Sequence, residues 1–360
     1  MHSIRILLKK QFDSIMTDVI TQFENEEQLE EALSRPSDEL VELFAQLEGD
    51  IMFLGVAGKM GISMAHMAKR AVDASGKDRR VIGVSRFSNE RAKDYLESLG
   101  VETIAGDLLD QDFLNGLPEV GNVIYLAGMK FGTEGNQSTT WAMNAYLPGL
   151  VANRFKNSKI VALSTGCVYP LVSPSSGGSK ETDHAMPVGE YAQSCLGRER
   201  LFEFGSSKFG TQGVLIRLNY AVEMRYGVLV DIAMKVYDQQ PIDLTMGYVN
   251  VIWQGDANNR ILRSLAHCTS PINHLNISGG ELLSVASLAK RFGELMAKPV
   301  ELVGKEANSA LLSNIGKSTT LFGLPETSID DVVQWTSKWV VSGKPLLGKA
   351  THFEVRDGKY

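Results

Sequence analysis

The sequence has few cysteines and no long apolar run. Its three cysteines, Cys167, Cys195 and Cys268, form no CxxC pair and no even set, which favours a reducing compartment over a disulfide framework. No stretch reaches the roughly 18 apolar residues that cross a bilayer. Residues 1–10 lack the apolar core and the cleavage site of a secretory signal. These absences predict a cytoplasmic protein that does not enter a membrane.

The sequence also lacks a block of basic residues and a set of metal ligands. Its 36 lysines and arginines face 42 acidic residues, and the net charge of −6 argues against a nucleic-acid partner. Its six histidines show no ligand spacing, so we expect no metal site. A length of 360 residues, 44% of them hydrophobic, is enough for one large or two moderate globular domains.

A glycine-rich turn follows the apolar residues 51–54, and a stretch of helical spacing follows the turn. Glycines let the backbone approach a pyrophosphate, which then lies at the positive end of the helix. An ordinary loop has the same glycine spacing, so the neighbouring segments must decide between the two. If it is a dinucleotide turn, its cofactor-binding residues are Gly55, Gly58, Lys59, Met60 and Gly61.

Further apolar runs predict strands at residues 80–86, 100–110, 122–128 and 159–163. A base at the end of the second strand suits a ribose 2′-phosphate, and Ser85 and Arg86 stand there, so NADP is favoured over NAD. A solvated arginine is the alternative. Asp107 and Leu108 end the next strand, where the acid can bond the adenine amino group. The following strand ends in small residues that let the backbone pass close to a ligand: Leu126, Ala127 and Gly128.

Strands that alternate with helices predict an α/β fold, a doubly wound parallel sheet of Rossmann type. We expect this domain at residues 50–218, with 249–275 returning to it. A helical extension at 1–49 precedes it, and Ser37 has the features of a helix N-cap there. A smaller substrate-binding lobe is expected at 219–248 and 276–345, followed by a tail at 346–360.

Taken together, the glycine turn, Gly106-Asp107-Leu108 and Leu126-Ala127-Gly128 resemble the extended short-chain dehydrogenase/reductase superfamily, in its NAD(P)-dependent epimerase/dehydratase branch. The resemblance covers about residues 51–340. It implies an NADP or NAD cofactor and a small sugar-like substrate. It also implies a homodimer built on helices whose apolar residues here are Trp141, Leu147, Leu196 and Phe202, although these four residues equally suit the core.

The resemblance also assigns a catalytic pair. Residues 164–170 are similar to the Ser/Thr-x-x-Val-Tyr-Gly signature, in which Thr165 would bind the reacting oxygen, with Cys167 beside the substrate. Tyr191 follows 26 residues later, where the family has the tyrosine that transfers the proton and contacts the cofactor. Asn144 matches an asparagine that often supports this site, although a packing role is an equal alternative.

One expected residue is missing from the site. The family has a lysine four residues after the tyrosine, one helical turn on, and this chain has Cys195. The lysine would hold the nicotinamide ribose and lower the pKa of the tyrosine. With the ordinary pKa of about 10, only about one phenol in a thousand is ionised at pH 7. Arg198, two turns after Tyr191, is either a substitute cation or a solvated helix residue.

The substrate lobe departs from the family as well. Met246 and Gly247 stand where sugar-nucleotide enzymes carry an Arg-Asp pair whose arginine clamps a phosphate. A charged hydrogen bond to phosphate contributes about 1.5–3 kcal/mol, so its loss favours a free sugar or a sugar acid. Asn219 and Arg225 are candidate substrate contacts, and a surface loop position is the alternative for Arg225.

These observations predict an NAD(P)-dependent oxidoreductase or epimerase that moves a hydride at a carbinol or ketone carbon of a polyhydroxylated substrate. Two alternatives stay open. One is a catalytically impaired cofactor-binding protein with a regulatory or structural role. The other is a nucleotide-sugar epimerase or dehydratase with a relocated phosphate clamp.

Overall fold

The computed structural model describes residues 22–130, 132 and 135–359. The first part of the expected helical extension, residues 1–21, lies outside this description, and so does the segment examined for a secretory signal. Within the described residues, no helix has the length and apolar character that crossing a membrane requires.

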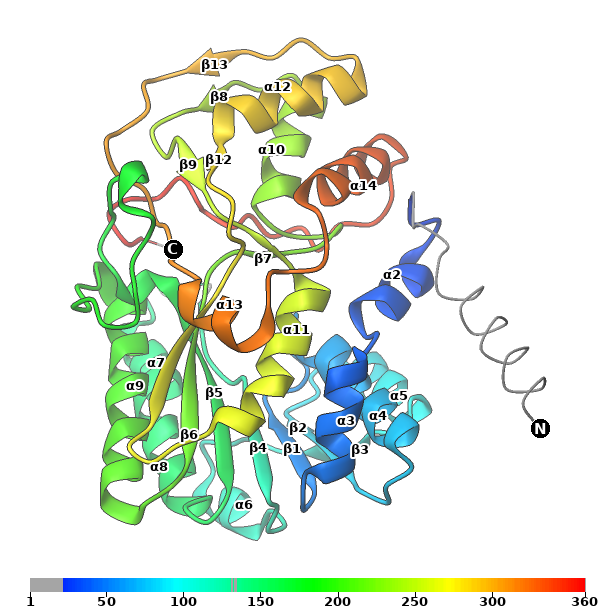
Figure 1. Ribbon diagram of the computed structural model, residues 1–360, viewed down its shortest axis with the longest axis vertical. Coiled ribbons are helices and arrows are strands. Elements are labelled where there is room, and N and C mark those ends of the chain that lie inside the picture. Colours follow the sequence, from blue (N-terminus) through cyan, green and yellow to red (C-terminus); the bar gives the residue numbers. More distant parts are fainter. Residues whose placement is uncertain (1–21, 131, 133–134, 360) are drawn as a thin grey trace.

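A seven-stranded parallel sheet forms the larger part of the molecule, in the order β11-β6-β5-β4-β1-β2-β3 (Figure 1). The apolar runs seen in the sequence become its strands because a parallel sheet buries both of its faces. The predicted doubly wound Rossmann fold is therefore confirmed. The strands are β1 (Ile51–Leu54), β2 (Val81–Ser85), β3 (Glu102–Ala105), β4 (Asn122–Tyr125), β5 (Lys159–Thr165), β6 (Gly213–Leu218) and β11 (Asn273–Ile277).

Helices cover both faces of this sheet, and alternate residues of β1 serve two different cores. Ile51 and Phe53 pack with helices α3 (Asp38–Gln46), α4 and α11, whereas Met52 and Leu54 pack with α6, α8 and α9. Figure 1 shows these helices on the two faces of the sheet. The helices around the sheet are α4 (Gly61–Ser75), α5 (Glu90–Ser98), α6 (Gln111–Gly116), α7 (Gln137–Trp141), the π-helical turn η1 (Ala142–Tyr146), α8 (Leu147–Arg154), α9 (Gly189–Phe209), α11 (Gln254–Arg263) and α13 (Gly316–Phe322).

A smaller lobe lies beyond the carboxyl ends of the strands and has its own core, in which Phe292 and Trp339 are fully buried. Its elements are α10 (Val228–Tyr237), β8 (Ile242–Asp243), β9 (Tyr248–Val249), β12 (Leu283–Ser284), α12 (Val285–Met296), β13 (Leu302–Val303) and α14 (Ile329–Val341). Short elements complete the chain: β7 (Ala221–Val222), β10 (Ile252–Trp253), η2 (Gly166–Val168), η3 (Pro174–Ser176) and η4 (Ser264–His267). The domain limits stay a prediction. The limit expected between residues 275 and 276 falls inside β11, which spans Asn273–Ile277.

The described part of the N-terminal extension links the two cores. α2 (Glu26–Leu33) buries Leu29 and Leu33 in the lobe, and α3 (Asp38–Gln46) packs Leu40 and Phe44 over the sheet. The predicted N-cap is present, since the Ser37 hydroxyl accepts a hydrogen bond from the amide of Leu40 at 3.3 Å. Residues 22–49 of the extension are thus part of the folded body.

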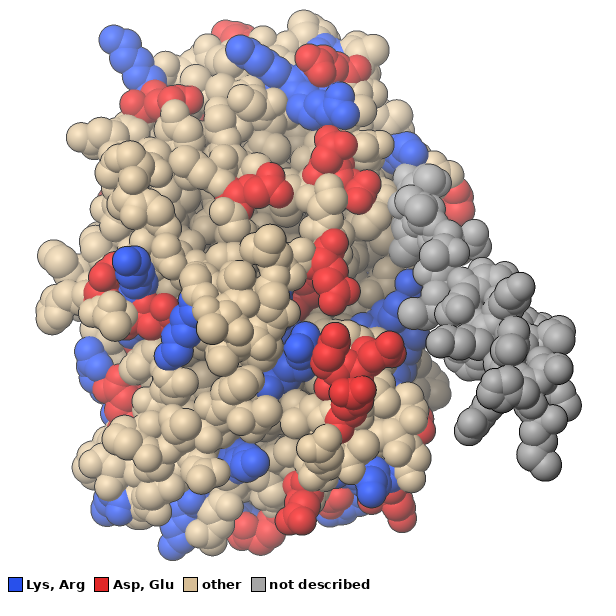
Figure 2. Space-filling model, in the orientation of Figure 1, with Lys and Arg blue, Asp and Glu red and all other residues tan. Residues whose placement is uncertain are grey.

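The segment expected as a tail is packed along the lobe. Phe353 is buried in the lobe core, and Gly358 lies so close to Val188 that a Cβ on it would be 2.2 Å from the Val188 carbonyl oxygen. Over the face shown in Figure 2, acidic and basic side chains are interspersed among uncharged ones.

Candidate functional site

The glycine turn between β1 and α4 is shaped by close backbone contacts. Gly55 has a φ of 90°, and a Cβ on it would lie 2.7 Å from the amide nitrogen of Ala127, at the end of the adjacent strand β4. A Cβ on Gly61 would lie 2.2 Å from the carbonyl oxygen of Val56. Only glycine allows both approaches. The turn therefore lies at the carboxyl ends of β1 and β4, where the strand order reverses, which is the place in such sheets where ligands bind.

Gly58 has a different role, because a Cβ on it would meet nothing nearer than the Gly55 carbonyl oxygen at 3.5 Å. Open space thus remains beside the first turn of α4, whose N-cap is Met60 and whose N–H groups point toward it. This cradle fits the pyrophosphate of a dinucleotide. The residues that would hold it are the predicted ones around Gly58, Lys59 and Met60.

The other predicted cofactor residues lie at the same edge of the sheet. Ser85 ends β2 and is half-buried, and Arg86 after it is exposed. Asp107 is exposed after β3, where its carboxylate accepts a hydrogen bond from the Leu109 amide at 3.0 Å, and Leu108 is buried in the core. The structure thus places the ends of β2, β1 and β4 side by side, as an extended dinucleotide requires.

Thr165 and Tyr191 come from separate elements and meet in one cavity of about 220 Å³. Thr165 ends β5, Tyr191 lies in the first turn of α9, and their hydroxyls are hydrogen-bonded. The lining also includes Lys59, Met60, Lys130, Cys167, Asn219, Tyr226, Gln254 and Thr351. Predicted cofactor-binding, catalytic and substrate-binding residues therefore share this cavity.

Burial raises the pKa of Tyr191 well above its ordinary value, and the neighbouring Cys195 and Cys167 raise it further. The positive charge of Arg198 and the hydrogen bond with Thr165 act in the opposite direction. At neutral pH the phenol is therefore protonated and can donate a hydrogen bond to an oxygen in the cavity. Only the ionised phenol can accept a proton, and a nearby cation is needed to stabilise this anion.

Cys195 is fully buried one turn after Tyr191, and burial raises the pKa of its thiol to about 11. The thiol is neutral at pH 7, so it is a poor nucleophile. Arg198 is buried as well, and it donates to the carbonyl oxygen of Leu163 and to Asn144 Oδ1, both at 2.7 Å. Its guanidinium takes the space in which a Cβ on Gly128 would stand, at 2.4 Å. Of the two alternatives for Arg198, the structure thus favours the substitute cation.

Asn144 connects the loop after β4 to the helix of Tyr191. Its amide accepts from the Met129 nitrogen and donates to the Met129 oxygen, both at 2.8 Å. It also donates to Ser194 Oγ at 3.0 Å, and that hydroxyl donates to the Tyr191 carbonyl oxygen at 2.8 Å. Asn144 therefore fixes the loop relative to the first turn of α9.

Beneath the cavity lies a buried ion pair between Glu199 and Arg217. Arg217 donates to both carboxylate oxygens, from Nε at 3.0 Å and from Nη2 at 2.7 Å, and Ser164 donates at 2.6 Å. Glu199, Glu203 and His274 are near enough to each other to hold a cation. Because Arg217 and Ser164 already engage the Glu199 carboxylate, we interpret this group as an ion-pair network that supports the residue before Thr165.

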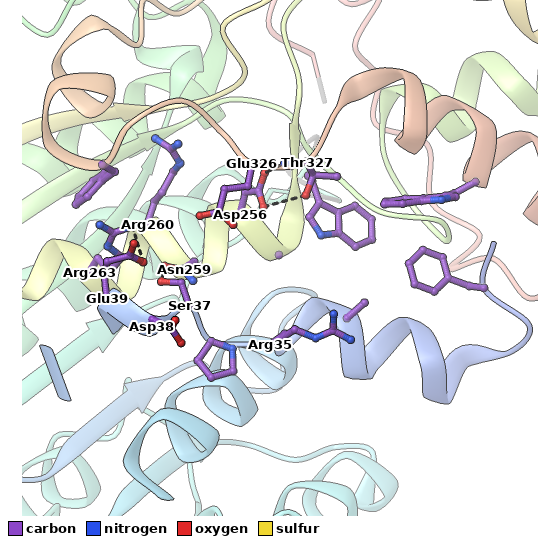
Figure 3. Close-up of a pocket in the computed structure, with 17 residues that line it drawn as sticks. Arg35, Ser37, Asp38, Glu39, Asp256, Asn259, Arg260, Arg263, Glu326 and Thr327 are labelled. Carbon is purple, nitrogen blue, oxygen red and sulfur yellow. Dashed lines mark hydrogen bonds and ion pairs between the residues drawn. The ribbon is translucent and has the colours of Figure 1, made fainter. Parts of the chain in front are cut away.

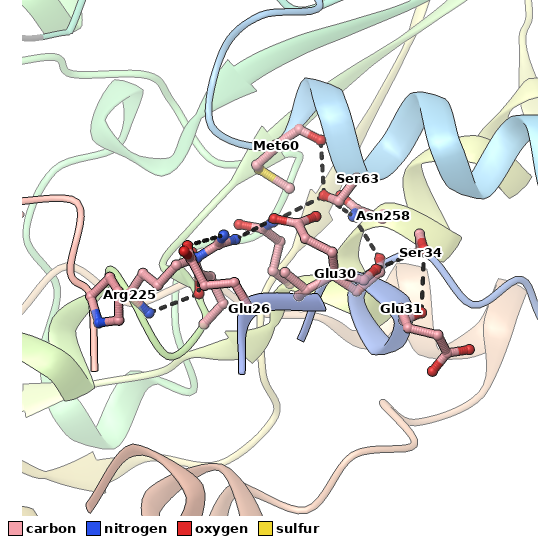
Figure 4. A network of polar contacts seen from close by, with 12 residues as sticks. Glu26, Glu30, Glu31, Ser34, Met60, Ser63, Arg225 and Asn258 are labelled. Carbon is pink, nitrogen blue, oxygen red and sulfur yellow. Dashed lines mark hydrogen bonds and ion pairs between the residues drawn. The ribbon is translucent and has the colours of Figure 1, made fainter. Parts of the chain in front are cut away.

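Two candidate substrate residues have different surroundings. Asn219 lines the cavity, where its side-chain amide donates to Asn250 Oδ1 at 3.1 Å. Arg225 does not line it. It forms ion pairs with Glu223 at 3.0 Å, Glu30 at 2.6 Å and Glu26 at 3.2 Å (Figure 4). The arginine thereby ties the lobe to α2.

A larger cavity of about 440 Å³ lies between the α2–α3 connection and α11 (Figure 3). Arg260 and Arg263 of α11 line it, and so do Asp38 and Glu39, so its charges are mixed. Its Asp256 carboxylate is already bound by the amide and the hydroxyl of Thr327, at 2.9 and 3.0 Å. None of its residues lines the cavity of Thr165 and Tyr191, and we assign no catalytic function to it.

Several residues of the cavity of Thr165 and Tyr191 are not expected from the sequence, among them Lys130, Tyr226, Gln254 and Thr351. Lys130 stands two residues after Gly128, at a predicted strand end, and this position could have identified it as a residue near the cofactor and the substrate. Tyr226 and Thr351 gave no local signal, because they reach the cavity through the packing of the lobe and of the C-terminal segment.

The sheet order, the glycine turn and the placement of Thr165 and Tyr191 are those that the resemblance to extended short-chain dehydrogenases/reductases predicts. Residues 51–222 match the model of the NAD dependent epimerase/dehydratase family. The resemblance seen in the sequence is confirmed. The family is one of NAD-dependent enzymes, which confirms the predicted enzyme class. No curated protein sequence matches the chain.

Several solved structures share the fold at low sequence identity. Pal from Bacillus thuringiensis has a TM-score of 0.67 at 18% identity, over 82% of this chain and 100% of its own. UDP-glucuronic acid 4-epimerase from Bacillus cereus has 0.66 at 18% identity, over 81% and 99%. dTDP-glucose 4,6-dehydratase from Bacillus anthracis has 0.69 at 14% identity, over 82% and 97%. At these identities the likeness concerns the fold.

Proposed function

We propose that the protein is an NAD(P)-dependent oxidoreductase or epimerase that acts on a carbinol or ketone carbon of a sugar-like substrate. One observation carries the proposal: the Thr165 and Tyr191 hydroxyls are hydrogen-bonded in a cavity that the cofactor turn also lines. Proton transfer to or from a substrate oxygen needs a group within hydrogen-bond reach, and two such groups meet here.

The residues have separate roles in this proposal. The nicotinamide cofactor supplies or accepts the hydride when it is bound. Thr165 orients the substrate oxygen, and Tyr191 holds the proton that this oxygen gains or gives up. Because the pKa of Tyr191 is raised, the phenol is ready to donate to a carbonyl oxygen. The opposite direction needs its anion, so oxidation should become faster as the pH rises.

The cavity supports a substrate of monosaccharide size. Its volume of about 220 Å³ is below the roughly 300–1,000 Å³ of pockets that hold drug-sized ligands. Met246, at the place of the missing clamp, is buried in the lobe core. A nucleotide sugar with a relocated clamp is the second candidate, because structures with the same fold are named as acting on UDP- and dTDP-sugars.

NADP is the proposed preferred cofactor, with NAD as the alternative. Arg86 is exposed at the end of β2, where a 2′-phosphate would meet its charge. Replacing Arg86 by Gln should raise the KM for NADP about tenfold or more, the effect of one charged hydrogen bond, and leave the KM for NAD nearly unchanged. Equal changes for both cofactors would argue against this role.

A homodimer is also proposed. Trp141, Tyr146 and Phe204 are exposed on α7, η1 and α9, at 39%, 53% and 59% of their surface. Apolar groups that gather on one face support an interface with a second copy. Leu147 and Phe202, two of the residues considered for this interface, lie in the sheet core instead. The cytoplasmic location stays a prediction.

The proposed function is tested by the absorbance of reduced nicotinamide, with NADP+ and separately NAD+, against free sugars, sugar acids and nucleotide sugars. Tyr191→Phe should abolish most turnover and still bind cofactor, whereas Tyr95→Phe, on the surface of α5, should behave as the unaltered protein. Cofactor binding without turnover of any substrate would point to the non-catalytic alternative. Thermal protection by UDP or dTDP would favour a nucleotide sugar.

A further inference from the structure

Two lysines from distant segments line the cavity of Thr165 and Tyr191, and a third lies nearby, although the chain carries a net charge of −6. Lys59 comes from the glycine turn and Lys130 from the loop after β4, and both line the cavity with Thr165 and Tyr191. Lys349 of the C-terminal segment lies near enough for its charge to act on Lys59. The cavity thus collects positive charge that the overall composition does not suggest.

Lys59 is held at the cavity wall. Its backbone lies between Gly58 and the N-cap of α4, and its ammonium group lies over the ring of Tyr226, 2.7 Å from the ring centre. Burial lowers the pKa of Lys59 to about 6, and the charges of Lys130 and Lys349 contribute to this shift. The lysines therefore repel each other in surroundings that screen charge poorly.

Lys130 is placed by a fixed segment of backbone. Both polar groups of Met129, the preceding residue, are bound by the Asn144 side chain at 2.8 Å. Burial lowers the pKa of Lys130, against the influence of Cys167, Asp231 and Cys195. Its position is thus set by the same asparagine that contacts the helix of Tyr191.

The acidic groups near these lysines are engaged by other residues. Asp231 accepts from the amide of Thr351 at 2.8 Å and from its hydroxyl at 2.5 Å. Glu223 accepts from the amide of Arg225 at 2.8 Å and from its Nε at 3.0 Å. Both raise the pKa of Lys59, but less than burial and the other lysines lower it.

We propose that Lys59 and Lys130 form a subsite for an anionic group of the substrate, the carboxylate of a sugar acid bound beside Thr165 and Tyr191. Burial and the neighbouring lysines lower the pKa of Lys59 to about 6, and a bound anion raises it again, so the carboxylate gains charged hydrogen bonds from both side chains. The inference rests on the proposed function and names a substrate class within it. Met246 stands where sugar-nucleotide enzymes carry a positively charged arginine. In this proposal, lysines of the nucleotide-binding domain supply that positive charge instead.

A phosphate would find the same chemistry, from a sugar phosphate or from the pyrophosphate of the cofactor, so the experiment must separate these sources. The variants are Lys59→Met, Lys130→Met and the double variant. Lys290→Met, on the exposed face of α12, is the matched control. Substrates are uronates and aldonates, each compared with its neutral parent sugar and with the sugar phosphate.

Each lysine variant should lower kcat/KM for the sugar acid about 10- to 100-fold, the effect of one charged hydrogen bond. For Lys130→Met, the value for the neutral sugar should change less than about threefold. Lys59 also belongs to the cofactor turn, so its variant is compared between acid and neutral sugar at saturating cofactor. Equal losses for acid and neutral sugar would overturn the inference, and so would a weaker affinity of Lys130→Met for the cofactor alone. A loss confined to sugar phosphates would overturn the choice of carboxylate.

Thermal shift provides a measurement that needs no turnover. Sugar acids should protect the unaltered protein more than their neutral parents or inorganic phosphate do, and the double variant should lose this difference. No protection by any acid overturns the inference. Full activity of Tyr191→Phe would instead overturn the proposed function, so the two failures are distinguishable.

Discussion

The ion pair of Glu199 and Arg217 makes a quantitative prediction. Both side chains are buried, at 0% and 4% exposure. Burial alone would raise the pKa of Glu199, but the nearby His274 side chain, at 3.6 Å, the hydrogen bonds from Arg217 and Ser164 and the charge of Arg217 lower it to about 2. The difference from the ordinary value of about 4.3 corresponds to about 3 kcal/mol of stability at neutral pH.

Replacing Glu199 by Gln should therefore lower the free energy of unfolding by about 3 kcal/mol at pH 7. A loss of this size agrees with the roughly 3–5 kcal/mol measured when one partner of a buried pair is removed. Glu203→Gln is the matched control, because Glu203 lies one turn away, is 26% exposed and pairs with Arg200 near the surface. It should cost at most about 1 kcal/mol. Urea unfolding followed by circular dichroism measures both.

The pH dependence gives a second check on the same variant. A carboxyl group whose pKa is lowered by folding stabilises the protein above its unfolded pKa, and this stabilisation is lost as the pH falls toward the folded pKa. The difference between the unaltered protein and Glu199→Gln should thus be constant from pH 7 to about 5 and shrink toward pH 2. Equal stabilities at pH 7, or a difference that does not vary with pH, would refute the reasoning.

Three further predictions concern other parts of the molecule. Gly58→Ala should weaken cofactor binding by up to about 2 kcal/mol, the value of an anion at a helix N-terminus, and leave the melting temperature unchanged. Gly61→Ala should instead destabilise the fold by about 1–3 kcal/mol because its Cβ would meet the carbonyl oxygen of Val56 at 2.2 Å. Calorimetry measures the stability of the two variants, and titration measures their affinity for the cofactor. The same changes in both variants would contradict both predictions. Arg225→Met should lower the free energy of unfolding by about 3 kcal/mol, because Glu30 and Glu223 would lose the positive charge that compensates them. A higher KM for the substrate at unchanged stability would instead indicate that Arg225 contacts the substrate. Phe204→Asp should convert a dimer into monomers in light scattering, and an unaltered mass would exclude this face as the interface.

The nucleotide-binding part of the fold could be predicted because its signals are local. Buried parallel strands read as short apolar runs, and a φ of 90° at Gly55 demands a glycine that is visible in the sequence. The same holds for Ser37, whose capping bond reaches only three residues along the chain. Such features depend on neighbours in the sequence and need no knowledge of the tertiary structure.

The walls of the catalytic cavity could be predicted only in part. Thr165 and Tyr191 were found by resemblance to a family, but Thr351 reaches the cavity because its amide and hydroxyl bond Asp231, 120 residues earlier. Arg225 had the charge for a substrate contact, and only the fold reveals the glutamates that surround it. Long-range packing of this kind leaves no periodic pattern in the sequence.

The packed C-terminal segment has a consequence for how the enzyme matures. Lys59 emerges from the ribosome long before Thr351, and the cavity has walls from both. A nascent chain can therefore form the sheet and the cofactor turn while the catalytic cavity is still open on one side. The chain acquires its finished cavity only when this later segment docks against α10, after the sheet and the cofactor turn can already have formed.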